Sequence, residues 1–240
     1  MPNDMSLPAF AKSPIWRLLP DRRLSVLLLD GVRFLNDLGV PRLPAKLIGG
    51  IGRLASAKPW RREVAGATEI GDPGEVAEGL DRLWGRAARR YEGIACRRDH
   101  AFLDWRFAQN PTWQYRYFVS RDGAGQLDAY VVTTTEQRMK TTVSHVVDML
   151  FGDDAGSLGR LLAFVSRVLR EEGTTVFGAI TSSPGLRAVL RGVGFRTVSR
   201  WLSRRGFHTA CAPHPHRPDA ARWCESGDAW YLTLADFDTI

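Results

Sequence analysis

The sequence predicts an α/β protein built on a mixed β-sheet, and three observations support this fold class. Residues 114–150 contain three consecutive segments rich in β-branched and aromatic residues, separated by glycine and polar turns. Residues 157–171 then carry leucine and valine at the 3.6-residue spacing of an amphipathic helix. Residues 174–180, TTVFGAI, read as a continuous buried strand. A strand, a helix and a second strand in this order predict a parallel pair in a sheet that is otherwise antiparallel.

Further elements are expected on both sides of this unit. A short strand at 64–70 precedes a helix at 75–91, whose apolar residues recur on one side. Asp99 can cap a helix at 100–109, which Asn110-Pro111 ends. After residue 180, a helix at 182–193, a short strand opening on Gly194-Phe195 and a strand at 229–234 are expected.

The charge divides the chain into two parts. Residues 1–62 hold eleven Lys and Arg against four Asp and no Glu, whereas residues 63–240 hold 22 basic and 22 acidic residues. We therefore treat 1–62 as a basic helical extension or connector and 63–240 as the domain. One helix of the extension is expected from an apolar face made by Leu24, Leu27, Leu28, Val32, Leu35 and Leu38.

The role of the basic extension has two interpretations. Its arginines either flank helices packed on the domain or contact an anionic membrane surface or a protein partner. The neutral domain shows no basic stripe with interleaved aromatics, so a nucleic-acid partner is not expected. The first twenty residues lack the pattern of a secretory signal, which predicts a cytoplasmic protein, in one interpretation peripheral to a membrane.

Cysteine and histidine usage gives no metal site. The three cysteines form no CxxC pair. Cys211, His214, His216 and Cys224 fall within fourteen residues, but their Pro-interrupted spacing matches no regular ligand pattern. No metal is therefore expected.

The turn after the third strand is the candidate ligand site. A strand that feeds a glycine-containing turn into a helix N-terminus can hold a phosphate on backbone N–H groups. The residues expected to do so are Gly156, Ser157, Gly159 and Arg160. Asp153 and Asp154 stand beside them, either as helix caps or as negative charges that repel an anion.

Three stretches resemble one protein family. Residues 98–107 (RDHAFLDWRF), 146–150 (VVDML) and 230–238 (WYLTLADFD) are similar to motifs of GNAT-like proteins associated with bacterial polysaccharide gene clusters. The resemblance implies the GNAT acyl-CoA N-acyltransferase fold, with acetyl-CoA or another acyl-CoA as co-substrate. It places the donor diphosphate at the turn after Leu150, where this chain departs from the glycine-rich family signature.

Acyl transfer needs a base for the amine, N–H groups for the thioester carbonyl and an acid for the leaving thiolate. Asp148 is the candidate base, or it accepts hydrogen bonds from Arg106 or a neighbouring turn. Backbone N–H groups of Met149 and Leu150 would face the thioester. Tyr231 or Tyr130 would protonate the thiolate, or serve as core residues.

Two functions follow from these residues. The first is an N-acyltransferase for a small amine or amino sugar, with Trp105, Arg106 and Trp230 forming the substrate wall. In this set Arg106 has a structural alternative, a bidentate pair with Asp99 or Asp104. The second function is a catalytically silent GNAT-like module that binds a protein partner or a membrane through its basic N-terminal segment.

Overall fold

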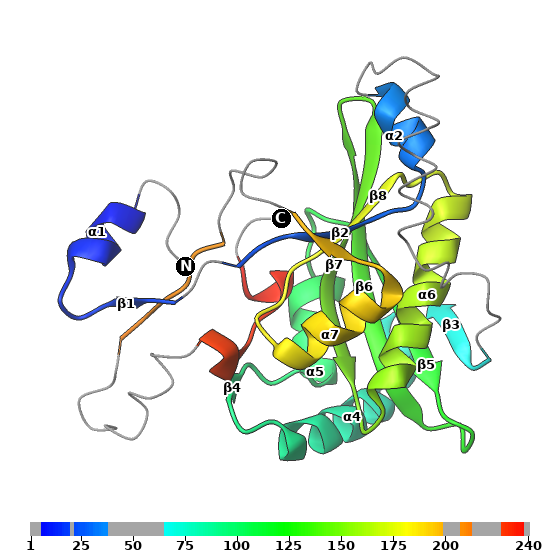
Figure 1. Cartoon of the computed structure of the whole chain (residues 1–240). Helices are drawn as coiled ribbons and strands as arrows, with labels where there is room; N and C mark the ends of the chain where they lie inside the picture. Colours follow the sequence, from blue (N-terminus) through cyan, green and yellow to red (C-terminus); the bar gives the residue numbers. More distant parts are fainter. Residues whose placement is uncertain (1–5, 20–21, 38–64, 199–206, 213–226, 238–240) are drawn as a thin grey trace.

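A computed structural model describes residues 6–19, 22–37, 65–198, 207–212 and 227–237. Within these residues, seven strands form one mixed sheet in the order β3-β5-β6-β7-β8-β2-β9 (Figure 1). Its β7 and β8 are parallel, and the other neighbouring strands are antiparallel. The mixed α/β fold class predicted from the sequence is confirmed.

The elements have the following bounds. The strands of the large sheet are β2 (Ser25–Leu28), β3 (Ala67–Ile70), β5 (Tyr115–Arg121), β6 (Leu127–Arg138), β7 (Thr141–Phe151), β8 (Val176–Ala179) and β9 (Arg196–Thr197). The helices are α1 (Leu7–Lys12), α2 (Gly31–Asp37), α4 (Ala77–Arg90), α5 (His100–Leu103), α6 (Ala155–Glu171) and α7 (Pro184–Val193), with short turns η2 (Pro73–Val76), η3 (Asp104–Ala108), η5 (Gly227–Ala229) and η6 (Leu234–Asp236). Two further strand pairs are β1 (Arg17–Leu18) with β10 (Ala210–Cys211), and β4 (Ile94–Ala95) with β11 (Trp230–Tyr231).

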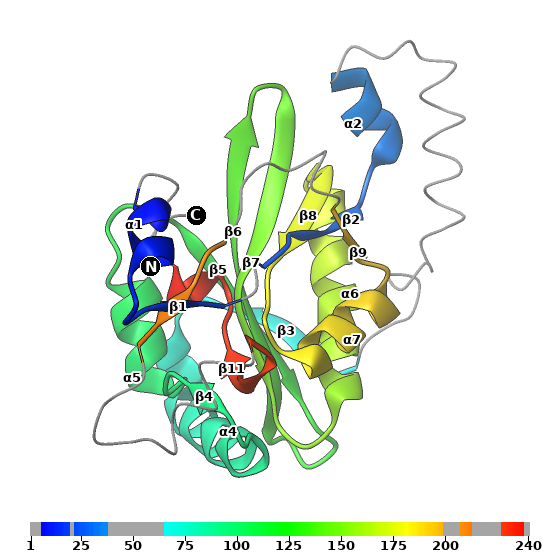
Figure 2. The ribbon, with the colours of Figure 1, turned by 60° about the vertical axis from the view of Figure 1, so that its left-hand side comes forward.

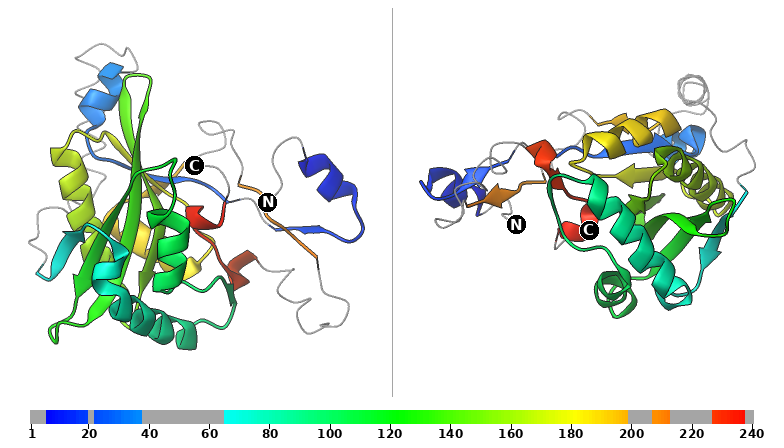
Figure 3. Two further views of the ribbon diagram at one scale, coloured as in Figure 1. Left: turned by 180° about the vertical axis from the view of Figure 1, so that it is seen from behind. Right: turned by 90° about the horizontal axis from the view of Figure 1, so that it is seen from below.

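The helices cover both faces of the sheet. Figure 3, in its view from below, shows α4 and α5 on one face and α6 and α7 on the other. Figure 2 shows the same division from the side, with the β6–β7 hairpin rising above both layers. One apolar core extends through this arrangement from α4 to α7.

The sequence explains where α6 begins, packs and ends. The Asp154 side chain caps its N-terminus by accepting the Gly156 N–H at 2.7 Å. Leu158, Leu161 and further apolar residues of its inner face are fully buried, at roughly 1.5–3 kcal/mol each. Gly173 ends the helix with φ +91°, a conformation that favours glycine.

A β-bulge separates the two parallel strands. β7 pairs with β8 from Val143 to Val146, and there the pairing ends. In the register with β6, Thr133 faces Val146 and Val132 faces Asp148, so Val147 is an extra residue. A bulge bends its strand and increases the local twist. The last residues of β7 therefore lie apart from the chain that leaves β8.

One sequence prediction for the N-terminal segment is wrong. Residues 25–28 form β2, which lies between β8 and β9, instead of continuing a helix through Leu24, Leu27 and Leu28. The apolar run suits a strand as well as a helix, and unpaired backbone groups beside β8 decide for the strand. Of the helix predicted around Leu35, the structure has the short helix α2. Residues 38–62 lie outside the described part of the chain.

Most remaining elements of the domain agree with expectation over the described residues, but the helix predicted over 100–109 is α5 followed by the π-helical turn η3. The C-terminal strand is shorter than predicted, because β11 covers only Trp230–Tyr231 and η6 follows. The proposed boundary at 62/63 lies outside the described residues and stays a prediction.

Candidate active site: a buried arginine network beside an apolar cavity

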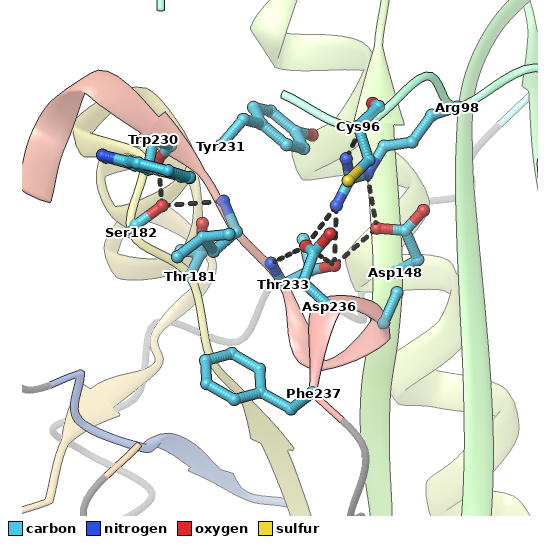
Figure 4. Close-up of polar contacts among 12 residues, drawn as sticks. Cys96, Arg98, Asp148, Thr181, Ser182, Trp230, Tyr231, Thr233, Asp236 and Phe237 are labelled. Atoms are coloured by element: carbon cyan, nitrogen blue, oxygen red, sulfur yellow. Dashed lines mark hydrogen bonds and ion pairs between the residues drawn. The ribbon is translucent and has the colours of Figure 1, made fainter. Parts of the chain in front are cut away.

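A buried ionic network joins the three stretches that resembled one family. Arg98 donates through Nε to Asp148 Oδ1 at 3.1 Å, and through Nη2 to Asp236 (Figure 4). Thr233 Oγ1 donates to Asp148 Oδ1 at 2.7 Å, and Tyr130 OH donates to Asp148 Oδ2 at 2.7 Å. The Asp148 carboxylate of β7 thus joins the segment before α5 to the C-terminal segment.

Local structure holds each member of the network in place. Asp99 caps α5 by accepting the Phe102 N–H at 3.1 Å, which fixes the chain direction beside Arg98. Asp148 follows the bulge at Val147. In the capping box of η6, Asp236 also accepts the Thr233 N–H at 2.9 Å.

Burial dominates the electrostatics of this network. The side chains of Arg98 and Asp148 are both 0% exposed. Burial opposes the charge on Arg98, but the carboxylates of Asp148 and Asp236 outweigh it and raise the Arg98 pKa. Burial raises the pKa of Asp236 although Arg98 acts in the opposite direction. Burial and the charge of Asp148 raise the Tyr130 pKa well above its usual value.

A cavity of about 300 Å³ lies beside the network. Its walls come from α4, the end of β7, the start of α7 and β11, and include Trp84, Arg90, Leu150, Phe151, Gly185 and Tyr231. The volume is at the lower end of the usual range for ligand pockets. Its position, where two parallel strands have separated, is the place where open α/β sheets bind ligands.

Tyr231 connects the cavity to the network. Its hydroxyl donates to the Met149 carbonyl, and its ring lies 4.8 Å from the Arg98 guanidinium carbon. Burial raises the Tyr231 pKa, with Asp148 adding to the effect, so the phenol is protonated at neutral pH.

The C-terminal segment bridges the gap between β7 and α7. The Ser182 N–H donates to the Leu232 carbonyl at 3.1 Å, and the Leu232 N–H donates to Ser182 Oγ at 2.7 Å. Together with the Tyr231 contact to Met149, these bonds hold residues 231–232 across the opened strands.

The turn expected to hold a phosphate carries its own anion. Asp154 accepts the Gly156 N–H, and Arg160 donates to Asp154 Oδ2 at 3.1 Å. The Gly156 N–H bond is the largest cause of a lowered Asp154 pKa. The cap interpretation of Asp154 is therefore confirmed, and its carboxylate occupies the helix N-terminus.

The other predicted cofactor residues have different surroundings. The Ser157 hydroxyl is buried and donates to the Asp154 carbonyl at 2.6 Å. Gly159 faces α7, where an added Cβ would lie 3.9 Å from Val189. Met149 and Leu150 are buried, and of the two Leu150 lines the cavity.

The three residues predicted to form a substrate wall have separate neighbours. Trp105 is 64% exposed beside Phe102, whereas Trp230 packs against Leu19 and Cys211. Arg106 donates to the Ala235 carbonyl at 2.9 Å and to the Phe237 carbonyl at 2.6 Å. The alternatives in which Arg106 pairs with Asp99 or Asp104, or donates to Asp148, are wrong, because the guanidinium clamps the C-terminal segment.

Comparison with known proteins gives structural neighbours only. No protein-family model matches the chain, and a search of curated proteins finds no match. Saccharomyces cerevisiae N-myristoyltransferase with bound myristoyl-CoA is similar over 79% of this chain and 49% of that chain, with 12% identity and a TM-score of 0.53. A GCN5-related N-acetyltransferase from Anabaena variabilis matches over 82% and 42%, with 10% identity and a TM-score of 0.50.

The fold is that of the GNAT acyltransferases. This confirms the fold that the three motifs implied. The chain spans less than half the length of these two neighbours. At such low identity the likeness establishes the GNAT fold alone.

The described residues offer neither a metal centre nor a membrane-spanning helix. They contain no group of three side chains arranged to hold a metal ion. His214, His216 and Cys224 lie outside them. No helix in the described ranges has the length and apolar character needed to cross a bilayer.

Sequence reasoning missed the central residue of the network. No role was assigned to Arg98 from the sequence, although it lies in the first motif. Arg106, from the same motif, was named as a candidate substrate-binding residue. The usable signal was that each motif contributes ionisable side chains, Arg98, Asp148 and Asp236, within otherwise apolar surroundings. A buried charge needs an oppositely charged partner. The three motifs could therefore have been expected to lie side by side in the fold.

Proposed function

We propose that this chain is an acyl-CoA-dependent N-acyltransferase whose donor enters the cavity between β7 and α7. The observation that carries the proposal is this cavity, lying at the separation of the parallel strands in a GNAT fold. A neighbour of the same fold was solved with myristoyl-CoA bound. Acetyl-CoA is the donor we would test first.

Tyr231 is the residue best placed for chemistry. In the transfer, the acceptor nitrogen forms a bond to the thioester carbon and gives up a proton to water. The carbon–sulfur bond breaks, and the thiolate takes a proton. Tyr231 lines the cavity and is protonated at neutral pH, so it fits the role of that acid.

Asp148 fits a positioning role better than proton abstraction. Both of its oxygens accept hydrogen bonds, from Arg98, Thr233 and Tyr130, and its side chain is fully buried. We assign it to holding the C-terminal segment, and with it Tyr231, against β7.

The acceptor class implied by the motif resemblance is a small amine or an amino sugar, as in polysaccharide assembly. Trp105 does not line the cavity, so this part of the proposal depends on the motif resemblance alone.

A second candidate, a catalytically silent module, has its own support. Asp154 occupies the helix N-terminus, and the region of strand β1 exposes Ile15, Trp16 and Leu18. Exposed apolar side chains of this kind mark binding surfaces. Such a module would bind a protein partner or a membrane surface through its N-terminal segment.

One experiment separates the two candidates. Acetyl-CoA would be incubated with the protein and a panel of amines and amino sugars, and release of the CoA thiol measured. The enzyme hypothesis predicts amine-dependent release that Ile15→Ser, Trp16→Ser and Leu18→Ser leave unchanged. Absence of both release and acetyl-CoA binding at millimolar concentration would contradict it.

A further inference from the structure

The turn before α6 is a poor place for the phosphates of the donor. Asp154 accepts the Gly156 N–H that an incoming phosphate would need, and its lowered pKa keeps the carboxylate charged. Arg160 already donates to Asp154. Asp153, next to it, adds a second negative charge. A phosphate at this helix N-terminus would meet two carboxylates at short range.

Arg90 offers a different anion partner at the cavity. It is the last residue of α4, and its side chain lines the cavity. Its guanidinium donates to the carbonyls of Phe151 and Gly152, and its central carbon lies 4.2 Å from the Phe151 ring centroid. These contacts orient the group but leave its charge uncompensated, because the acceptors are neutral.

Among the described residues, Arg86 and Arg187 each pair with a carboxylate, and Arg90 does not. Arg86, one helical turn earlier, pairs with Asp153 at 3.3 Å. Arg187, on α7, pairs with Asp228 at 2.9 Å. Within the described ranges, no carboxylate lies within ion-pair distance of Arg90. Arg90 is exposed to solvent, and its unpaired charge lies beside a cavity whose other lining side chains are largely apolar.

We propose that Arg90, rather than the turn before α6, binds the anionic group of the ligand that enters the cavity. The planar guanidinium fork suits phosphate and carboxylate oxygens equally. The inference rests on the proposed function, in which the anion is the diphosphate of an acyl thioester carrier. A free fatty acid, with its carboxylate at Arg90 and its chain in the cavity, is the second source of the same chemistry.

The test measures the affinities of acetyl-CoA and octanoate, separately, by calorimetric titration of the whole chain. Arg90→Gln is expected to weaken acetyl-CoA binding at least tenfold, because it removes a charge-assisted hydrogen bond to the anion. Arg89→Gln is the matched control, because Arg89 is its exposed neighbour and does not line the cavity. Arg160→Gln tests the turn. Both controls should stay within twofold of the wild type.

Two checks separate binding from folding. Arg90→Lys retains the charge without the fork and should recover part of the lost affinity. Thermal unfolding of each variant shows whether the loss of the Phe151 and Gly152 contacts disturbs the fold. If Arg90→Gln binds acetyl-CoA as the wild type does, or if Arg160→Gln or Arg89→Gln loses as much, the inference is overturned.

The octanoate arm distinguishes this inference from the proposed function. Octanoate binding that depends on Arg90, without any acetyl-CoA binding, would support the anion site and overturn the acyltransferase. Acetyl-CoA binding that Arg90→Gln leaves unchanged would support the acyltransferase and overturn the anion site at Arg90. A wild-type protein that binds neither ligand would overturn both.

Discussion

Arg98 and Asp148 are fifty residues apart in sequence, and their side chains form a fully buried ion pair with 3.1 Å between Nε and Oδ1. Asp236 adds a second carboxylate to the same guanidinium. The pair joins the region before α5, the strand β7 and the C-terminal segment. It therefore fixes the position of Tyr231 relative to the cavity.

Removing the arginine should destabilise the fold strongly. We expect Arg98→Met to lower the free energy of unfolding by about 3–5 kcal/mol, because two carboxylates would remain buried without their cation. Urea denaturation of both proteins measures the difference. The control is Arg82→Gln, whose exposed pair with Glu78 is expected to contribute less than about 1 kcal/mol. A loss below about 1 kcal/mol for Arg98→Met would show that the network is not structural.

His145 should give the fold a pH dependence near neutrality. Burial lowers its pKa from 6.5, although the hydrogen bond to Glu136 opposes the shift, and nearby Arg138 adds to it. As pH falls below 6.5, the unfolded chain takes up this proton before the folded chain does. The stability linked to His145 is therefore full above 6.5 and is lost as pH falls from there toward the folded-state pKa.

Denaturation at pH 7.5 and pH 5.5 tests this sign. The wild type should lose more stability than His145→Gln between the two values. An equal or larger loss in His145→Gln would contradict the assigned cause.

The cap of α6 should depend on hydrogen bonding rather than on charge. Asp154→Ala is expected to lower the free energy of unfolding by about 1 kcal/mol, and Asp154→Asn by much less, since Asn caps helices equally well. Asp153→Ala serves as the neighbouring control. The interpretation fails if Asp154→Asn is as harmful as Asp154→Ala.

Tyr231→Phe should separate chemistry from donor binding. Under the proposed function, kcat should fall about 10²–10⁴-fold and KM for the donor should change far less, because the variant loses the acid and one hydrogen bond to the Met149 carbonyl but keeps the aromatic ring in the cavity wall. Tyr91→Phe is the matched control. Its ring packs edge-on against Tyr231, and its hydroxyl has no hydrogen-bond partner within the described ranges. Equal effects of the two variants on kcat would rule out Tyr231 as the acid.

The sequence predicted elements better than it predicted contacts. Periodicity located α4, α6, α7 and the three long strands, because each buries one face of a regular element. It misassigned residues 25–28, whose partner β8 lies about 150 residues away. No local pattern reports a strand pairing at that separation, so a short apolar run stays ambiguous.

In the candidate site, too, local features were predictable from the sequence and long-range contacts were not. The cap at Asp154 is local, and the sequence offered it as one of two interpretations. The contacts of Arg98 with Asp148 and Asp236 join three segments that are distant in the sequence. The sequence indicates that each buried charge needs a partner, but it does not indicate which residue is the partner. The clamp of Arg106 on backbone carbonyls leaves no trace in side-chain patterns, because any residue supplies a carbonyl.

The most direct measurement is a calorimetric titration of acetyl-CoA into the wild type and into Gly185→Trp. Gly185 lines the cavity, and an added Cβ would meet only Ser183 Oγ at 3.7 Å, so the backbone leaves room for a side chain to begin at this position. We predict saturable binding to the wild type and its loss in Gly185→Trp. No binding to the wild type, or equal binding to both, would contradict the assignment of the cavity as the donor site.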